Sequence, residues 1–545
     1  MPAPSRWRSL WATCRPYEIV SPLGAGGMRQ VYDTTDGVVQ THSVDAFAGV
    51  ARFTRVVEVV EWAVGLAACA YLLTYLVIAL LRVTYRFDLE WLEGATADHV
   101  HRILTGQKIY VQPSLAYTPF LYPPLYYYVS AAVALVTGMS LLPLRLVSLA
   151  SSIGCFWLVY RLLARETGSR YAGIVASGMF AATYRIGGAW LDLARVDSLF
   201  LLLFLGAVYI VRFHASTRSW AMAGALLALS ALTKQTALML AVPLILYAAI
   251  VDWRRAAILL VIFAGVFGLI TLSLNVWQGG WYLYYTVGLP AHVNAIVGVP
   301  IVSRASLRVW RRDFFAPMPL AAVVGWASLF VRTRLFTRET LFYFILAIGL
   351  VGSAWISRLH QGAYDNVLIP AYLSFAILLA LAVNDIPKFA TGSAHLCLRM
   401  FMGVVCLVQF VALAYDPRAQ IPTRRDVESS QRLMQVMRQF DGEVYLADHG
   451  FFPILAGNTS HAQTRAIFDI DLSADRGVEG PLSKELRTAL EQRRFSLLVL
   501  DDTLSPSLQQ EVERSYRRAG PSVEFEGPHS VTGHETHPRL FYVPR

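Results

Sequence analysis

The stretch Trp62-Ala-Val-Gly-Leu-Ala-Ala-Cys-Ala-Tyr-Leu-Leu-Thr-Tyr-Leu-Val-Ile-Ala-Leu-Leu81 contains no charged residue and forms the centre of an apolar segment from Val56 to Val83. A helix needs about 20 mostly apolar residues to cross the hydrocarbon of a bilayer. Segments of this kind recur as far as Tyr415, and 55% of the 545 residues are hydrophobic against 15% charged. The sequence therefore predicts an integral membrane protein that crosses the bilayer many times.

The apolar segments after the first one have soft boundaries. The run from Tyr122 to Gly138 is short and opens with Pro123-Pro124, so that it could span the membrane, re-enter it or lie in the interface. We expect further spans at residues 142–163, 171–184, 198–213, 219–232, 236–251, 256–276, 315–331, 339–356, 366–384 and 395–415. The predicted fold is an all-α polytopic domain of about 11–13 transmembrane helices over residues 56–416.

Positive charge is concentrated in the short connections between apolar segments. The net charge of +10 therefore indicates membrane topology and not a nucleic-acid surface. Basic clusters that include Arg161, Arg212, Arg254 and Lys388 mark alternate connections as cytoplasmic, because basic residues resist translocation. The other loops and the C-terminal tail are then predicted to face outward from the cytoplasmic membrane. The outward loop 277–314 carries several arginines, for which a lipid phosphate would be a suitable partner.

The first 55 residues are polar and mixed. Tyr17 to Tyr32 resembles the glycine-rich opening of bacterial serine/threonine kinases, but the later kinase motifs do not follow it, and Arg29 stands in place of the third glycine. We predict a cytoplasmic leader without phosphate-binding function. No apolar run closely follows Met1, so we expect the first span to act as an uncleaved signal-anchor. The five cysteines lack zinc-type spacing, and a disulfide framework is not expected.

The composition turns polar near Asp416, and helical and strand patterns then alternate. Residues 417–545 are predicted to form a small α/β domain, which we interpret as an accessory module on the acceptor side. Asp448-His449 and Asp501-Asp502 follow two of its strands, where a site could lie. The expected helices are 428–440, 483–494 and 506–518, and the expected strands are 443–447, 496–500 and 540–543.

Three carboxylates, Asp88, Glu90 and Glu93, lie within six residues where the chain leaves the first span. A carboxylate near an apolar boundary has a raised proton affinity and can act as a general base toward an acceptor hydroxyl. The alternative is that these acidic residues merely mark the solvated start of a helix. The spacing of the three carboxylates is compatible with both interpretations.

The order of several motifs resembles the GT-C superfamily of polyprenyl-phosphate-sugar glycosyltransferases. It is most similar to the branch of the lipid A aminoarabinose transferase and the protein O-mannosyltransferases. After the acidic first loop come Gly106-Gln-Lys-Ile-Tyr110 and Tyr122-Pro-Pro-Leu125. They are followed by Ala194-Arg-Val-Asp197, Leu232-Thr-Lys-Gln-Thr236 and the stretch from Ser357 to Pro370, all on loops predicted to face outward.

This resemblance implies a membrane glycosyltransferase. A first-loop acid would activate the acceptor while the sugar leaves a polyprenyl phosphate with inversion at the anomeric carbon. The implied acceptor is a lipid, a cell-surface polysaccharide or a protein. Glu93 aligns best with the acidic pair of the family, but Leu92 stands where its acidic neighbour is expected, so that Asp88 or Glu90 could supply the base.

The resemblance also nominates residues that bind the substrate, above all cations that would neutralise the leaving phosphate. For Lys234 the alternative is snorkelling to the interface, and for Arg195 it is an ion pair with Asp192 or Asp197. For His360 and Asn366 the alternative is capping of a loop. The nominated residues are Tyr122, Arg195, Asp197, Lys234, His292, Arg358, His360 and Asn366.

No cofactor is expected besides the lipid-linked donor. His99 and His101 point to different sides of a helix and form no recognisable metal-ligand set with Asp98. A polytopic transporter or lipid flippase is the alternative function, although such proteins usually contain internal repeats and none is evident here. The expected partners are the bilayer, the sugar donor and an outward acceptor.

Overall fold

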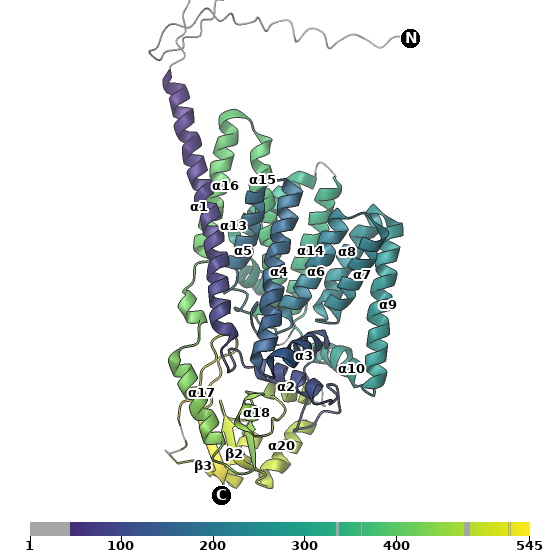
Figure 1. Ribbon diagram of the computed structural model, residues 1–545, viewed down its shortest axis with the longest axis vertical. Helices are drawn as coiled ribbons and strands as arrows, with labels where there is room; N and C mark the ends of the chain where they lie inside the picture. Colours follow the sequence, from purple (N-terminus) through teal and green to yellow (C-terminus); the bar gives the residue numbers. More distant parts are fainter. Residues whose placement is uncertain (1–43, 334–336, 361, 473–479, 521–522, 524) are drawn as a thin grey trace, which may run out of the picture.

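The computed structural model describes residues 44–333, 337–360, 362–472, 480–520, 523 and 525–545. Figure 1 shows a bundle of helices, one end of which carries a small sheet with its own helices. Most of the predicted leader, including its glycine-rich fragment, lies outside the described residues. The first helix, α1 (Val44–Val83), begins earlier than the expected Val56.

Among the described residues, six helical segments are long and apolar enough to cross a membrane. A seventh arises if α12 and η2 are joined to α13 across a bend of 94°. The predicted all-α polytopic fold is confirmed. Five of the six are single helices: α1 within Gly49–Val83, α4 (Leu141–Thr167), α9 (Trp253–Trp277), α14 (Arg338–Arg358) and α16 (Gly392–Ala412). The sixth, Asp365–Phe389, consists of η3 (Asp365–Leu368), α15 (Ile369–Asp385) and η4 (Ile386–Phe389).

Four shorter helices pack among these spans: α5 (Arg170–Ala182), α6 (Asp197–Phe213), α7 (Thr217–Ala231) and α8 (Thr236–Val251). With 13 to 17 residues they reach roughly 20–26 Å, which is less than the ~30 Å of bilayer hydrocarbon. The described chain thus has six or seven full spans by length and composition, fewer than the expected 11–13. Largely buried loops, residues 183–196 and 232–235, connect α5 to α6 and α7 to α8.

The undecided run 122–138 forms the helix α3 (Leu125–Thr137), which starts directly after Pro123-Pro124. Its 13 residues reach about 20 Å, too short to cross. It packs on α2 (Glu93–Leu104) and α4. Figure 1 shows α3 at the same end of the bundle as the C-terminal part. The structure therefore favours a helix that does not span the membrane.

The segment 277–314, expected as a loop, is largely helical. It contains α10 (Trp281–Leu283), η1 (Tyr284–Gly288), α11 (Leu289–Val297), α12 (Arg304–Val309) and η2 (Trp310–Phe315), and it leads into α13 (Pro319–Thr333).

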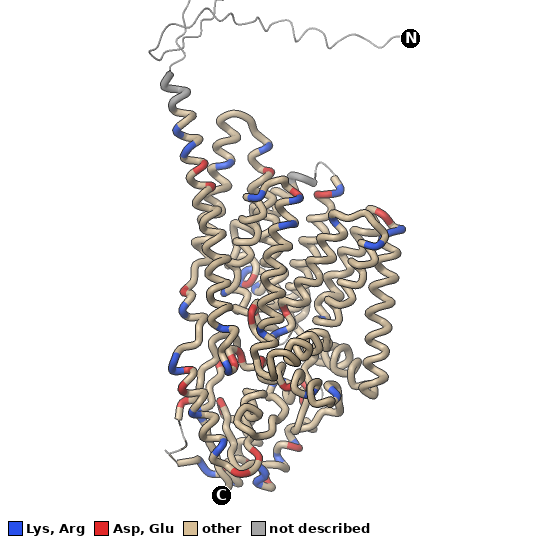
Figure 2. The backbone as a smooth tube through the Cα atoms, viewed as in Figure 1, with Lys and Arg blue, Asp and Glu red and all other residues tan. Residues whose placement is uncertain are grey.

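The two ends of the bundle differ in the connections they carry. The basic connections between α4 and α5, α6 and α7, α8 and α9, and α15 and α16 lie at the end away from the sheet (Figure 1). The first loop after α1 and residues 183–196 lie at the sheet end, with the first loop against the C-terminal part. Figure 2 shows that most charged residues gather toward the two ends.

The C-terminal part contains a mixed sheet in the order β1-β2-β4-β3, with β1 parallel to β2 and β4 antiparallel to both β2 and β3. The predicted α/β character is confirmed, although the last expected helix ends at Ser515, where β3 begins. The elements are η5 (Pro417–Gln420), α17 (Arg424–Met437), β1 (Glu443–Leu446), α18 (Phe452–Ala456), α19 (Thr464–Asp471), α20 (Pro481–Glu491), β2 (Phe495–Leu500), α21 (Pro506–Ser515), β3 (Tyr516–Arg518) and β4 (Leu540–Pro544).

Candidate active site

Glu93, the first residue of α2, is completely buried in an ion pair with Arg145 of α4. Glu93 Oε1 accepts from Arg145 Nε at 3.0 Å and from the Ala194 N–H at 2.7 Å. Glu93 Oε2 accepts from Arg145 Nη2 at 2.6 Å and from the Leu89 N–H at 2.7 Å. Burial opposes the ionisation of Glu93, but Arg145 and these hydrogen bonds outweigh it, and the pKa of Glu93 is lowered.

The sequence resemblance favours Glu93 as the general base, but this geometry does not suit that role. Both of its oxygens are engaged by N–H donors, so that no free position remains to take a proton from an acceptor hydroxyl. The carboxylate instead joins the first loop to α4 and to the loop before α6. Glu93 is therefore a structural anchor of the site.

Glu90 is completely buried but is not paired in this way. Its Oε2 accepts from the Leu92 N–H at 3.2 Å, and its Oε1 has no hydrogen-bond partner among the described residues. Burial raises the pKa of Glu90 to about 8, with Arg195 acting in the opposite direction. The raised proton affinity expected for a first-loop acid is thus found at Glu90, and also at Asp88, but not at Glu93.

Arg195 lies near Glu90, is only 3% exposed, and has two nitrogens whose N–H groups find no acceptor among the described residues. Its Nε and Nη1 have no hydrogen-bond partner within the described part of the chain, while Nη2 lies 3.4 Å from the Tyr122 hydroxyl. The guanidinium also lies within 6 Å of the rings of Phe120, Tyr122 and Trp190. A buried cation with free donors is well suited to bind an anion.

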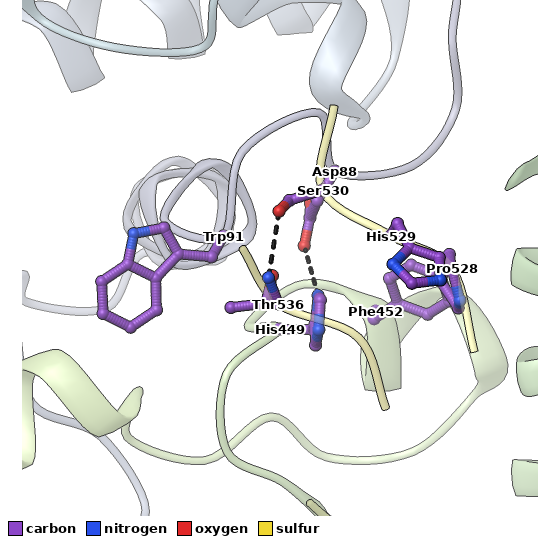
Figure 3. Close-up of a pocket in the computed structure, with 8 residues that line it drawn as sticks. All are labelled: Asp88, Trp91, His449, Phe452, Pro528, His529, Ser530 and Thr536. Carbon is purple, nitrogen blue, oxygen red and sulfur yellow. Dashed lines mark hydrogen bonds and ion pairs between the residues drawn. The ribbon is translucent and has the colours of Figure 1, made fainter. Parts of the chain in front are cut away.

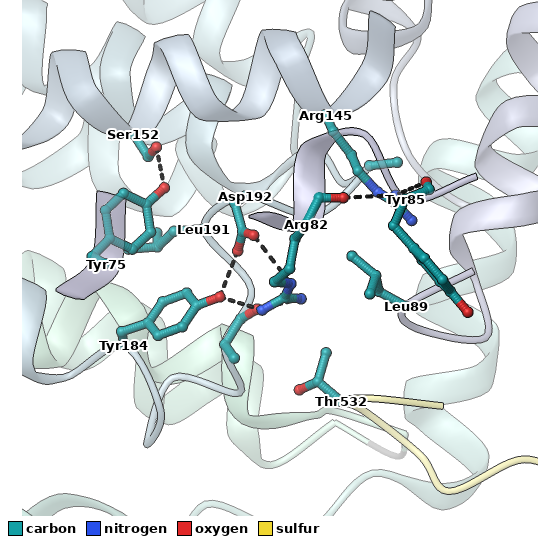
Figure 4. Close-up of polar contacts among 12 residues, drawn as sticks. Tyr75, Arg82, Tyr85, Leu89, Arg145, Ser152, Tyr184, Leu191, Asp192 and Thr532 are labelled. Atoms are coloured by element: carbon teal, nitrogen blue, oxygen red, sulfur yellow. Dashed lines mark hydrogen bonds and ion pairs between the residues drawn. The ribbon is translucent and has the colours of Figure 1, made fainter. Parts of the chain in front are cut away.

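Arg195 does not form an ion pair with Asp192 or Asp197, which was the alternative to a role in substrate binding. Asp192 lies 3.2 Å from Arg82 Nε and accepts from the Tyr184 hydroxyl at 2.7 Å, as Figure 4 shows. Asp197, the other possible partner, is bonded to Lys234. Both aspartates are therefore engaged by other side chains, and Arg195 is left for a different partner.

Lys234, Asp197 and Asn366 meet at the start of α6. Lys234 Nζ lies 2.6 Å from Asp197 Oδ1, and Asn366 Nδ2 donates to the same oxygen at 3.0 Å. All three are buried, and Asp197 Oδ2 has no partner among the described residues. The structure thus brings together three predicted site residues from segments far apart in the sequence, only two positions along the chain from Arg195.

The remaining nominated residues are arranged less favourably. Arg358 is bonded to Asp313 at 2.8 Å and to Asp365 at 3.1 Å, so its charge is already neutralised. His360 is half-buried in the turn after α14, and His292 is exposed on α11. His292 is therefore not brought into the buried cluster around Asp197.

Asp88 contacts the C-terminal part, which the sequence predicts to be an accessory module in which a site could lie at Asp448-His449 and Asp501-Asp502. Asp88 Oδ2 lies 3.6 Å from His449 Nδ1, and His449 Nε2 lies 3.1 Å from Asp501 Oδ2. Burial opposes protonation of His449, but the two carboxylates outweigh it and raise the pKa of His449 to about 10. Figure 3 shows Asp88 and His449 in a small pocket, which is also lined by Trp91, Phe452, Pro528, His529, Ser530 and Thr536.

The described residues contain no group of three or more His, Cys, Asp or Glu side chains that could hold a metal ion. His99 Nε2 accepts from the Phe120 N–H at 3.0 Å, and its Nδ1 faces the Ala95 carbonyl. Burial lowers the pKa of His99 to about 3. His99 is thus a neutral core residue that fixes the chain before α3.

Residues 122–278 match the family described as dolichyl-phosphate-mannose-protein mannosyltransferase. This region contains Tyr122, Arg195, Asp197 and Lys234, but not the first-loop carboxylates. No curated protein sequence matched the chain.

Several solved structures share its fold, including two that cover most of the chain. One is ArnT from Cupriavidus metallidurans bound to undecaprenyl phosphate, with a TM-score of 0.53 at 12% identity, covering 87% of this chain and 98% of that one. The other is the Archaeoglobus fulgidus oligosaccharyltransferase tethered with an acceptor peptide, with a TM-score of 0.50 at 11% identity, covering 86% and 74%. The chain thus resembles the dolichyl-phosphate-mannose-protein mannosyltransferase family in sequence over residues 122–278, and its helical fold is similar to that of GT-C membrane glycosyltransferases.

Proposed function

We propose that the protein transfers a sugar from a polyprenyl-phosphate carrier to an acceptor outside the cytoplasmic membrane, with inversion at the anomeric carbon. In this proposal Glu90 is the general base and Arg195 binds the leaving phosphate. The acceptor is a lipid, a cell-surface polysaccharide or a protein, and the C-terminal α/β part lies on the outer side. The neighbours named above support a lipid-linked donor, since one is bound to undecaprenyl phosphate.

One observation carries this proposal. Arg195 Nε, Arg195 Nη1 and Glu90 Oε1 are buried polar atoms without hydrogen-bond partners in the part of the chain that the structure describes, on two residues close enough to influence each other's charge. Leaving such groups unpaired costs free energy, and functional sites are where this cost is tolerated. A phosphate would satisfy the guanidinium donors, and a hydroxyl would satisfy the carboxylate oxygen.

With Glu90 as base and Arg195 at the phosphate, the transfer is a displacement at the anomeric carbon. The acceptor oxygen forms a bond to the anomeric carbon while the bond from that carbon to the phosphate oxygen breaks. Glu90 takes the hydroxyl proton, and the leaving polyprenyl phosphate carries away the electron pair of the broken bond. Arg195, held in surroundings from which water is largely excluded, neutralises the charge that develops on this phosphate. A single displacement of this kind inverts the configuration.

The first test separates donor binding from chemistry. The donor-site probe is undecaprenyl phosphate, and turnover is followed with a panel of undecaprenyl-phosphate and dolichyl-phosphate monosaccharides. Arg195→Met should weaken binding of undecaprenyl phosphate by at least about 10-fold, because it removes a charge-assisted contact. The matched control is Arg254→Met, whose exposed guanidinium lies 5.6 Å from the Trp253 ring centroid at the start of α9.

The second variant tests the base. Glu90→Gln preserves the size of the side chain and should lower kcat by about 10²–10⁴-fold while undecaprenyl phosphate still binds. Glu58→Gln, on the exposed face of α1, is its control. Unchanged turnover in Glu90→Gln would remove Glu90 as the base. Movement of the lipid-linked sugar across vesicles without a new glycosidic bond would instead favour a transporter.

A further inference from the structure

A short segment near the C-terminus, Val531–Gly533, lies against the first loop. The backbone N–H groups of Val531 and Thr532 both donate to the Leu89 carbonyl, at 2.9 and 3.1 Å. Leu89 directly precedes Glu90, so the segment fixes the peptide that carries the proposed base. Figure 4 shows Thr532 at the edge of the polar cluster that contains Leu89.

Thr532 also reaches a second loop. Its hydroxyl donates to the Gly188 carbonyl at 2.6 Å. Gly188 belongs to the largely buried connection between α5 and α6, which contains Arg195 and leads into Asp197, the first residue of α6. One residue of the C-terminal part therefore bridges the loop of Glu90 and the loop of Arg195.

Gly533 provides an independent observation at the same place. Its φ is +86°, and a Cβ on this residue would lie 2.6 Å from Glu90 Cγ. The Tyr364 hydroxyl donates to the Gly533 carbonyl at 2.8 Å and ties the segment to the chain just before η3. The close approach of Gly533 to Glu90 thus depends on the absence of a side chain.

We infer that Thr532 is a positioning residue that sets the spacing between Glu90 and Arg195, so that the C-terminal part completes the active site. This inference rests on the proposed function for its effect on turnover. A misplacement of about 1 Å can cost about 10²-fold in rate. The bridge acts on the relative position of the two loops and not on the phosphate contact itself.

The test compares Thr532→Val with Thr532→Ser in the full-length protein. Thr532→Val loses only the hydroxyl bond, and we expect kcat to fall by about 10- to 100-fold with the donor KM nearly unchanged. Thr532→Ser keeps the hydroxyl and should restore kcat. Thr488→Val is the matched control, because the Thr488 hydroxyl donates at 3.0 Å to the carbonyl of Lys484 in its own helix.

A second readout does not depend on activity. Amide hydrogen exchange in peptides covering residues 85–92 and 183–190 should become faster in Thr532→Val but not in Thr532→Ser or Thr488→Val. Gly533→Ala should likewise lower kcat by displacing Glu90. Equal turnover and equal exchange in Thr532→Val and Thr488→Val would overturn the inference. If the wild type forms no glycosidic bond, the proposed function fails, and the exchange experiment still decides whether the bridge exists.

Discussion

Arg145 and Glu93 form an ion pair with a shortest distance of 2.6 Å, and neither side chain is exposed to solvent. Arg145 also donates to the carbonyls of Arg82, Tyr85 and Phe87, so a single guanidinium gathers the chain as it leaves α1. The pair holds the first loop in place beneath the spans. Loss of its charge balance should therefore affect folding more directly than chemistry.

Glu93→Ala should lower the free energy of unfolding by about 3–5 kcal/mol, because it leaves Arg145 buried without its counter-charge. Thermal unfolding of the detergent-solubilised protein measures this effect. The double variant Glu93→Ala/Arg145→Met should recover part of the loss. A stable Glu93→Ala protein that binds undecaprenyl phosphate normally but does not turn over would contradict this expectation and return the role of base to Glu93.

The activity of the wild type should rise with pH. A general base must be deprotonated, and burial raises the pKa of Glu90 to about 8. We expect kcat/KM to increase as the pH rises through about 8 and to level off above it. Glu90→Gln should show no such rise. A profile that is already flat between pH 6 and 9 in the wild type would place the base on a group with an ordinary carboxyl pKa.

The fold and part of the site could be predicted from sequence because they depend on local patterns. The length of apolar runs identified the membrane domain, and alternating patterns after Asp416 identified the small sheet. The meeting of Lys234, Asp197 and Asn366 was also predictable in outline, since each lies on a loop assigned to the same face.

The pairing of buried charges could not be predicted in this way. Arg145 lies 52 residues after Glu93, inside a stretch expected to be an ordinary span, and nothing in the local sequence connects the two. His449 is still farther from Asp88, and although its place after a strand marked it as a candidate site residue, nothing in the sequence connected it to the first loop. Which carboxylate is free and which is neutralised depends on tertiary contacts, so the choice among Asp88, Glu90 and Glu93 required the structure.

His449→Gln should weaken the contact between the C-terminal part and the first loop. His449 lies between Asp88 and Asp501 and is cationic at neutral pH, with a pKa of about 10. Because the folded-state pKa is above the usual 6.5, the stabilisation is full below about pH 6.5 and is lost as the pH rises toward 10.

The thermal midpoint of His449→Gln should therefore lie below that of the wild type at pH 6.5, and the gap should close by about pH 10. Arg438→Gln is a suitable control, because this exposed residue donates to the Leu455 carbonyl in the same part of the chain. A gap that stays constant across this pH range would mean that the imidazole acts through its shape and not through its charge.

The ammonium group of Lys234 lies 2.6 Å from Asp197 Oδ1 and forms an ion pair with it. Lys234→Met should destabilise the protein by about 3–5 kcal/mol, since Asp197 then remains buried without a cation. The double variant Lys234→Met/Asp197→Asn removes both charges and should regain most of the stability.

An ammonium has three donors, and we expect those not used by Asp197 to contact the donor phosphate. The stable double variant should then still bind undecaprenyl phosphate about 10-fold more weakly than the wild type. Wild-type affinity in the double variant would show that Lys234 serves only to neutralise Asp197.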